Sequence, residues 1–402
     1  MSSIPVLPAS TMPAMNVIIV IANGWNTGWL GCYGNEWLQT PCLDQFAAES
    51  VLFDEHYAVN PSPAEWARAL VSGRFEGDIA SGFGARVVHV QDARQPIALF
   101  RSAQHVPVIR DDEQSPGAPL LKAVKKQLPT DGPFLMIVET DRLLPTWSVS
   151  LDFFDKYIDS VSRDEGDESP QPWDEPPQGQ VELSNRDIER LQATYAAVVS
   201  EWDADFGKLM KLLGPRLDDT AVIVTSGHGQ SLGERGWIGP VCGAIHEETG
   251  HVPLMIRLPG AKNAQRHVRA LTSSVDLLPT IHDLLGVPPL PSLHGRSLRP
   301  LTERLLPPAL PYVIQSLADG RQSLQTGQCT LVTAPGTPAR LYDKPGDRWE
   351  MHDCRMLHLE WAEHLESLLP VWKAAIKAEP FVPPELGQLE EEVEDEHREA
   401  GG

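Results

Sequence analysis

Short apolar runs alternate along this chain with longer segments in which apolar residues recur at three- and four-residue intervals. Each strand-like run is followed by a helical pattern, in the pairs 16–21 with 43–49, 134–138 with 188–213, and 221–225 with 274–285. Strands that alternate with helices in this way predict a parallel sheet covered by helices on both faces. The pattern therefore indicates an α/β fold.

The segment 185–213 has the clearest helical pattern. At 3.6 residues per turn its apolar residues form one stripe, made of Leu191, Tyr195, Val198, Val199, Trp202, Phe206, Leu209 and Leu213. An amphipathic helix buries such a stripe against its neighbours. We expect this helix to pack its stripe on the sheet.

Pro-rich and acidic segments divide the chain. A Pro-rich passage at 287–311 separates a main domain, predicted at 1–300, from a small C-terminal subdomain at 312–378. Within the main domain, the segment 161–180 is acidic, Pro-rich and poor in aliphatic residues, so we expect a mobile surface insertion. The acidic residues 379–402 predict a disordered tail.

The charge of the chain is strongly negative. Its 402 residues carry a formal net charge of −22. Half of that charge lies in two segments, with six acidic residues and one Arg at 163–175, and seven acidic residues and one Arg at 390–399. Nucleic acids and anionic membranes are bound by basic surfaces, so neither is expected as a partner. No apolar run approaches the ~18 residues of a membrane span.

The cysteines and the first residues indicate a compartment. Neither a disulfide framework nor a zinc site is indicated, because the five cysteines are widely spaced and include no CxxC pair; they are Cys32, Cys42, Cys242, Cys329 and Cys354. The first 15 residues contain no Lys or Arg, and the apolar run 17–22 is too short for the core of a secretion signal. We therefore predict a protein of the reducing cytoplasm.

Five blocks of the sequence carry a recognisable pattern. They are NVIIVIANGWNTGWLGCYGNEWLQTPCLDQFAAESVLFDEHYA at 16–58, DDTAVIVTSGHGQSLGERGWIG at 218–239, HEETGHVPLMIRLPG at 246–260, SSVDLLPTIHDLLGVP at 273–288 and LYDKPGDRWE at 341–350. In order and content they resemble the sulfatases, a family of the alkaline phosphatase superfamily. The resemblance implies a sulfatase-like α/β fold, with a large, mixed, mostly parallel sheet between helices and a small C-terminal subdomain.

The resemblance also implies a chemistry. Sulfatases attack a sulfate ester with a formylglycine made from Cys or Ser. They hold a calcium or magnesium ion in oxygen ligands, chiefly carboxylates, which neutralise charge on the transferring group. In open α/β sheets such groups lie at the carboxyl ends of the strands.

The metal-ligand positions of that pattern are degenerate here. The two aspartates expected after the first strand fall on Asn23 and Gly24, and the aspartate of the later Ser-Asp-His-Gly motif falls on Gly227, beside His228. One amide and one imidazole make a poor cage for calcium or magnesium, which prefer six or more oxygens with negative charge among them. No cofactor is expected, and aspartates restored at the three positions should raise metal affinity without restoring turnover.

The nucleophile positions are degenerate as well. Counted back from a downstream Ser-Gly pair, the formylglycine slot falls on Pro63 and the arginine slot on Ala67. Arg68 comes one residue late and is rotated by about 100° on a helix. The family's lysine falls on Pro240, and its histidine after the second strand falls on two leucines at 143–144.

Other polar and aromatic residues near these positions are weaker candidates. Ser62 could attack a substrate, although its Asn-Pro-Ser-Pro context is typical of a turn. His228 could act as a base, although a local hydrogen bond is the commoner role of a lone histidine. A further polar cluster could bind a transition metal or serve only structure, and three tryptophans could line a pocket or fill the vacated cleft; these are His246, Glu247, Glu248 and His251, and Trp25, Trp29 and Trp66.

Three functions follow from these positions. Loss of the carboxylates, nucleophile, arginine, lysine and histidine removes charge neutralisation, covalent catalysis and leaving-group protonation together. We therefore predict a sulfatase-like protein that has lost hydrolase activity and binds a small molecule or a protein, which would leave an ordered pocket. Tight metal binding would instead indicate an active sulfate- or phosphate-ester hydrolase with a rearranged site. A filled cleft would indicate a structural or interaction protein.

Overall fold

The structure, a computed structural model, describes residues 14–76, 85–93, 99–109, 116–158, 170–240, 242–288, 290, 292–303 and 310–387. In this part of the chain a central sheet has eight strands: β1 (Asn16–Ala22), β2 (Val51–Phe53), β4 (Arg86–Asp92), β5 (Gln104–Pro107), β6 (Phe134–Thr140), β8 (Thr220–Thr225), β11 (Leu254–Arg257) and β12 (Arg266–Val268). Their order is β12-β2-β11-β8-β1-β6-β4-β5. Only β11 runs antiparallel to its neighbours, so the predicted mixed, mostly parallel sheet is confirmed.

The middle strand, β1, sets the position of the site. All seven of its residues are buried, as expected for a Val- and Ile-rich strand covered on both faces. It pairs in parallel with β6 on one side and β8 on the other, with Val20 opposite Val138 and Val224. The carboxyl ends of these three strands therefore meet at one edge of the sheet.

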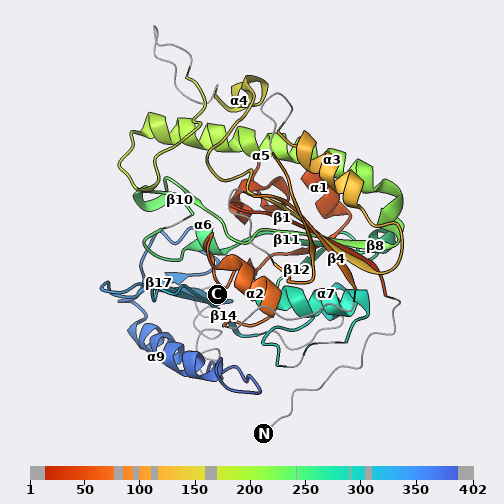
Figure 1. Ribbon diagram of the computed structural model, residues 1–402. Coiled ribbons are helices and arrows are strands. Elements are labelled where there is room, and N and C mark those ends of the chain that lie inside the picture. Colours follow the sequence, from red (N-terminus) through yellow and green to blue (C-terminus); the bar gives the residue numbers. More distant parts are fainter. Residues whose placement is uncertain are drawn as a thin grey trace.

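Helices cover both faces of the sheet (Figure 1). One face is covered by α1 (Pro41–Ala48), α3 (Ala118–Gln127), α4 (Leu151–Ile158) and α5 (Asn185–Leu213), and the other by α2 (Trp66–Ser72), α7 (Leu277–Leu285) and α8 (Arg299–Thr302). Helix α5 has the predicted bounds. It begins after Ser184, whose hydroxyl accepts a hydrogen bond from the Asp187 amide, and its predicted apolar stripe is buried in the core.

A separate small sheet forms the C-terminal subdomain. Its antiparallel strands are β14 (Tyr312–Ser316), β15 (Gln322–Thr326), β16 (Cys329–Thr333) and β17 (Arg340–Asp343), and α9 (Leu359–Ala375) packs against them. Ala69 and Phe75 of the main domain join the same apolar cluster. The shorter elements are β3 (His56–Tyr57), β7 (Gly179–Gln180), β9 (Ser231–Leu232), β10 (Trp237–Gly239), β13 (Thr272–Ser273) and α6 (Glu247–Gly250).

Part of the acidic insertion predicted at 161–180 is packed against α5. The Arg190 guanidinium lies 4.7 Å from the centre of the Trp173 ring, and the Trp173 amide donates a hydrogen bond to Thr194 Oγ1 at 3.1 Å. The stretch 170–180 thus has contacts with α5, because Trp173 gives it apolar surface to bury, and the mobility of the insertion stays a prediction. The rest of the insertion lies outside the described residues.

The first residues of the predicted disordered tail pack on the body of the protein. Phe381 packs on Phe75 and His294, with ring centres 5.6 and 4.7 Å apart, and Leu386 is buried in the C-terminal cluster. Two apolar side chains therefore hold 379–387 to the body, and the disorder of the tail stays a prediction. Residues 388–402 lie outside the described part.

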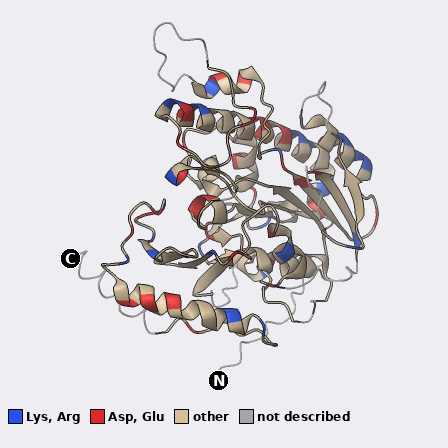
Figure 2. Ribbon diagram, turned by 60° about the vertical axis from the view of Figure 1, so that its left-hand side comes forward, with Lys and Arg blue, Asp and Glu red and all other residues tan. Residues whose placement is uncertain are grey.

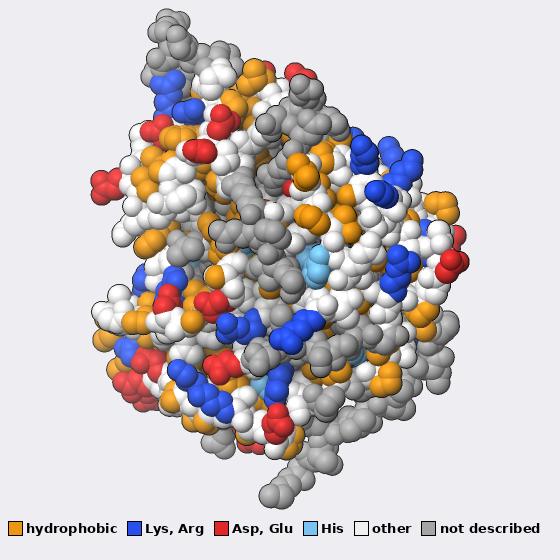
Figure 3. All heavy atoms as spheres, in the orientation of Figure 1, with side chains coloured by type: hydrophobic (Ala, Val, Ile, Leu, Met, Phe, Trp, Pro, Cys, Tyr) orange, Lys and Arg blue, Asp and Glu red, His pale blue; other side chains and the backbone are white. Residues whose placement is uncertain are grey.

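Charge is spread over the surface. Figure 2 shows Asp and Glu along α9 and α5, so the acidic excess is not confined to the two acidic segments. On the face drawn in Figure 3, basic, acidic and apolar side chains are interspersed. Within the described residues, no helix is both long and apolar enough to cross a membrane.

Candidate functional site

The residues at the predicted ligand positions meet at one edge of the sheet. Asn23 follows β1 and Gly227 follows β8, and they are in contact: the Gly227 amide donates a hydrogen bond to Asn23 Oδ1 at 3.2 Å. Asn23 Nδ2 donates to Asp141 Oδ1 at 3.0 Å and is 3.4 Å from Glu139 Oε1. Asn23 therefore links the ends of β1, β6 and β8 through hydrogen bonds, at a position where the resemblance leads us to expect a metal ligand.

Trp66 fills the space beside Gly227. A Cβ atom on Gly227 would lie 2.3 Å from Trp66 Cδ2 and 2.6 Å from Cε3, whereas real Cβ atoms essentially never come closer than 3.0 Å to such neighbours. Trp66 is 4% exposed and belongs to the apolar cluster on the α2 face of the sheet. Of the two roles left open for Trp66, filling the cleft is the one that the structure supports.

Leu144 fills the corresponding space beside Gly24. A Cβ atom on Gly24 would lie 2.6 Å from Leu144 Cδ2 and 3.1 Å from Gln230 Nε2, and the backbone φ of +88° disfavours any side chain there. The Gly24 carbonyl accepts hydrogen bonds from Gln230 Nε2 at 3.0 Å and the Tyr195 hydroxyl at 2.6 Å. Aspartate side chains at the two glycines would therefore meet occupied space, and the expected rise in metal affinity stays a prediction.

His228 is held by a local hydrogen bond. Its Nδ1 donates to the Gly229 carbonyl at 2.8 Å, which leaves the lone pair on Nε2, a buried atom with no hydrogen-bond partner among the described residues. Burial lowers the pKa of His228, so the ring is neutral. The local hydrogen bond expected for this histidine is present, and its role stays a prediction.

The nucleophile block forms the turn that precedes α2. The Ser62 carbonyl accepts the Trp66 amide at 3.1 Å, and Ser62 Oγ is buried without a hydrogen bond to a base among the described residues. Pro63 is half-buried, Ala67 is 6% exposed and packs in the α2 core, and Arg68 is exposed to solvent. A serine without a base is not an activated nucleophile.

The last predicted site position is Pro240, and the remaining tryptophans are Trp25 and Trp29. Pro240 follows β10 and is half-buried, and it carries no amine that could replace the family's lysine. Trp25 is fully buried and donates from Nε1 to the Trp29 carbonyl at 3.2 Å. Trp29 packs edge-on against Tyr195 of α5, with ring centres 4.9 Å apart. Both tryptophans belong to the core on the α5 face.

Two carboxylates at the end of β6 were missed in the sequence. Glu139 Oε2 accepts hydrogen bonds from His89 Nε2 at 2.8 Å and Gln91 Nε2 at 3.0 Å, and burial raises the pKa of Glu139. Asp141 bonds to Asn23, as described above. The Glu-Thr-Asp-Arg run directly after an apolar strand was the signal that could have revealed them, since strand ends face the site.

These groups do not fit a calcium or magnesium ion. The Asn23 oxygen already accepts the Gly227 amide, both glycines lack side chains, and His228 offers one neutral nitrogen. A hard divalent cation needs several oxygens, with negative charge among them. Across the described residues, no group of three or more His, Cys, Asp or Glu side chains is placed to hold a metal ion.

The charged side chains of the second polar cluster, in and next to α6, form ion pairs, most of them with the C-terminal subdomain. Lys344 Nζ lies 3.1 Å from Glu247 Oε2 and 3.5 Å from Glu350 Oε1. His246 Nδ1 bonds to Glu350 Oε2 at 2.6 Å, and Arg235 Nη1 pairs with Glu248 Oε1 at 2.8 Å. Charges paired in this way fasten the loop after β17 to the main domain. Of the two roles left open for this cluster, the structural one is supported.

His251 completes this network as a cation. Its Nδ1 faces Glu247 Oε1 at 2.5 Å and its Nε2 faces the Asp54 carbonyl at 2.8 Å. Both partners are acceptors, so both ring nitrogens carry protons. Although burial opposes it, the Glu247 carboxylate raises the pKa of His251 above its ordinary value of 6.5.

His251 should therefore make stability depend on pH. Its contribution is fully present below the unfolded pKa of 6.5 and is lost as pH rises through the higher folded pKa. The difference in unfolding free energy between wild type and His251→Gln should shrink as the pH rises above 6.5, as measured by urea unfolding. The exposed His267→Gln serves as the control, and an unchanged difference would contradict a charged His251.

Comparisons with known sequences find similarity to sulfatases. Residues 115–287 match the family model "Sulfatase". Arylsulfatase K of Gallus gallus is 34% identical over 122 residues, which are 30% of this chain and 22% of that protein. N-acetylglucosamine-6-O-sulfatase of Bacteroides thetaiotaomicron is 36% identical over 111 residues, 27% of this chain and 20% of that protein. The aligned regions span about a fifth of the length of these curated relatives.

Solved structures extend the likeness over the whole fold. Phosphonate monoester hydrolase of Agrobacterium radiobacter superposes with a TM-score of 0.71 at 20% identity, covering 88% of this chain and 95% of that one. A 2-O GAG sulfatase gives 0.72 at 16% identity, covering 91% and 93%. The fold is thus the one that these two proteins share. The match at 115–287, which is less than half of the chain, shows a similarity in sequence to the sulfatase family.

Proposed function

We propose that this chain is a sulfatase-family protein without hydrolase activity, which acts by binding a partner. The observation that carries the proposal is the Trp66 ring, which occupies the space into which a side chain at Gly227 would point. A filled cleft favours an interaction role over a relic that binds a small ligand in the old site. Sulfate-ester hydrolysis and phosphonate-ester hydrolysis remain properties of the relatives.

Each catalytic role of the family lacks a side chain here. The nucleophile slot is Pro63, the arginine slot is Ala67 and the lysine slot is Pro240. Without these groups, the attacking atom, the charge on the transferring group and the leaving-group proton have no provider. The proposal includes a cytoplasmic location, supported by five cysteines that form no disulfide in the described part of the chain.

Turnover assays test this proposal. The purified full chain should hydrolyse 4-nitrophenyl sulfate, 4-nitrophenyl phosphate and a phenyl phosphonate no faster than buffer does, with or without added calcium or magnesium. Mass spectrometry of the tryptic peptide that ends at Arg68 should show no aldehyde. Hydrolysis that disappears in Ser62→Ala or His228→Gln would instead establish a rearranged hydrolase site, and the proposal would be wrong.

A further inference from the structure

Strand β12 leaves one edge of the main sheet open. It is the end strand of the order given above, and none of the described strands pairs with its outer side. It runs parallel to β2, with His267 opposite Leu52, and the Val268 carbonyl accepts the Asp54 amide at 2.9 Å. Peptide groups alternate along a strand, so Arg266 and Val268 bond to β2. The N–H and C=O of His267 point outward.

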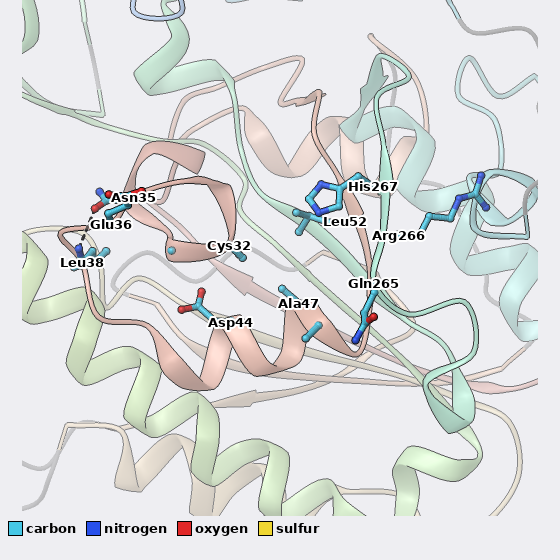
Figure 4. A pocket seen from close by; sticks show the side chains of 12 residues that line it. Cys32, Asn35, Glu36, Leu38, Asp44, Ala47, Leu52, Gln265, Arg266 and His267 are labelled. Atoms are coloured by element: carbon cyan, nitrogen blue, oxygen red, sulfur yellow. Dashed lines mark hydrogen bonds between the residues drawn. The ribbon is translucent and has the colours of Figure 1, made fainter.

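A groove lies beside this edge, on the α1 face of the sheet. Its volume is about 700 Å³, within the range of sites that take small molecules or single side chains. Leu52, Ala47 and Ala48 give it an apolar wall, and Asp44 gives it a carboxylate. Figure 4 shows Asp44 rising from α1 toward the turn that carries Cys32.

The charge around the groove is acidic. Asp44 and the exposed Glu36 line it, and the ring of His267 is paired with Asp54 at 2.8 Å. Arg266 also lines the groove, but Figure 4 shows its side chain pointing to the side of β12 away from α1. Burial raises the pKa of Asp44, so its carboxylate gains from a neighbouring cation. The net charge of −22 also steers a cationic partner toward the molecule.

The backbone leading into β12 is held in an unusual conformation. Ala261, Asn263 and Gln265 have φ values of +52°, +62° and +59°, a left-handed region that is costly for residues other than glycine. Gln265 also lines the groove. Strain of this kind persists where the surrounding structure fixes the chain, and it gathers at binding sites.

We propose that β12 and this groove form a docking site for an extended, basic segment of a partner protein. The segment adds to the sheet as a further strand by bonding to the outward peptide group of His267, a mode in which backbone bonds give affinity and side-chain pockets give specificity. A Lys or Arg side chain of the added strand lies in the groove and pairs with Asp44. The docking site consists only of β12, α1 and the groove, so it is separate from the filled catalytic cleft.

Binding of a synthetic peptide to the full chain tests the proposal. The probe is an acetylated peptide of alternating Thr and Lys residues, titrated by fluorescence anisotropy. A version with N-methyl groups on alternate peptide bonds keeps the charge but cannot form strand hydrogen bonds, and it should bind about tenfold more weakly. A version with Glu for Lys should not bind. Hydrogen exchange should show new protection of the His267 amide, with none along α9.

Matched variants locate the site. Ala48→Trp covers the groove from an exposed position, and it should abolish binding, whereas Gln45→Trp on the same helix but outside the groove should not. Asp44→Asn and Glu36→Gln should each weaken binding roughly threefold, and the distant exposed acid change Asp152→Asn should leave it unchanged. Equal binding of the N-methylated peptide, or equal loss in all acid variants, would show that only net charge attracts the peptide and would overturn the proposal.

Discussion

Gly227→Ala is expected to lower the free energy of unfolding by about 3 kcal/mol, the upper part of the usual range for overpacking a core. The added Cβ atom would lie 2.3 Å from Trp66 Cδ2, and a buried indole on a helix has little room to move. Gly327→Ala is the control, since nothing lies within 4 Å of a Cβ atom there. Urea unfolding of the two variants measures the difference.

A double-mutant cycle identifies the cause of that loss. Trp66→Ala alone should cost ~3 kcal/mol or more, as for other large buried aromatic residues. The double variant Gly227→Ala/Trp66→Ala should lose less than the sum of the two single variants by about 2 kcal/mol, because the clash is absent without the indole. Additive losses would mean that Trp66 does not occupy the space beside Gly227.

Lys344→Met should destabilise the protein by about 3 kcal/mol, the typical cost of removing one partner from a buried ion pair. The substitution would leave Glu247 and Glu350, both buried, without the ammonium that lies within 3.1 and 3.5 Å of them. The effect should appear in thermal and urea unfolding. Restoration by Lys344→Arg would be partial, because the guanidinium has a different shape.

Lys208→Met is the matched control for this prediction. Lys208 pairs with Asp205 at 2.8 Å, but its side chain is 55% exposed, and exposed pairs contribute about 0 to 1 kcal/mol. A loss in Lys344→Met that is no larger than the loss in Lys208→Met would contradict the view that the α6 network fastens the C-terminal subdomain to the main domain.

The helices and strands of the fold could be predicted because their signals are local. The bounds of α5 follow from its apolar stripe, and β1 and β8 agree to within one residue with the apolar runs at 16–21 and 221–225. The packed stretches 170–180 and 379–387 were missed because acidic composition was taken to outweigh their few aromatic and aliphatic residues. A single half-buried aromatic residue, such as Trp173 or Phe381, decides such a case.

Only part of the candidate site could be predicted from the sequence. The empty ligand positions at Asn23, Gly24 and Gly227 could be read directly. What replaced them could not, because Trp66 and Leu144 are distant in sequence from the glycines that they cover, and only the fold brings them together. The α6 cluster shows the same limit, since its charge partners Lys344 and Glu350 come from another subdomain.

The divalent-metal content of the purified full chain tests the central claim most directly. Elemental analysis after dialysis against a buffer that contains calcium and magnesium should find well under one tightly bound ion per chain, because Asn23, Gly24, Gly227 and His228 supply no carboxylate to the ancestral position. One calcium or magnesium ion retained per chain would contradict the account of a filled, non-catalytic site.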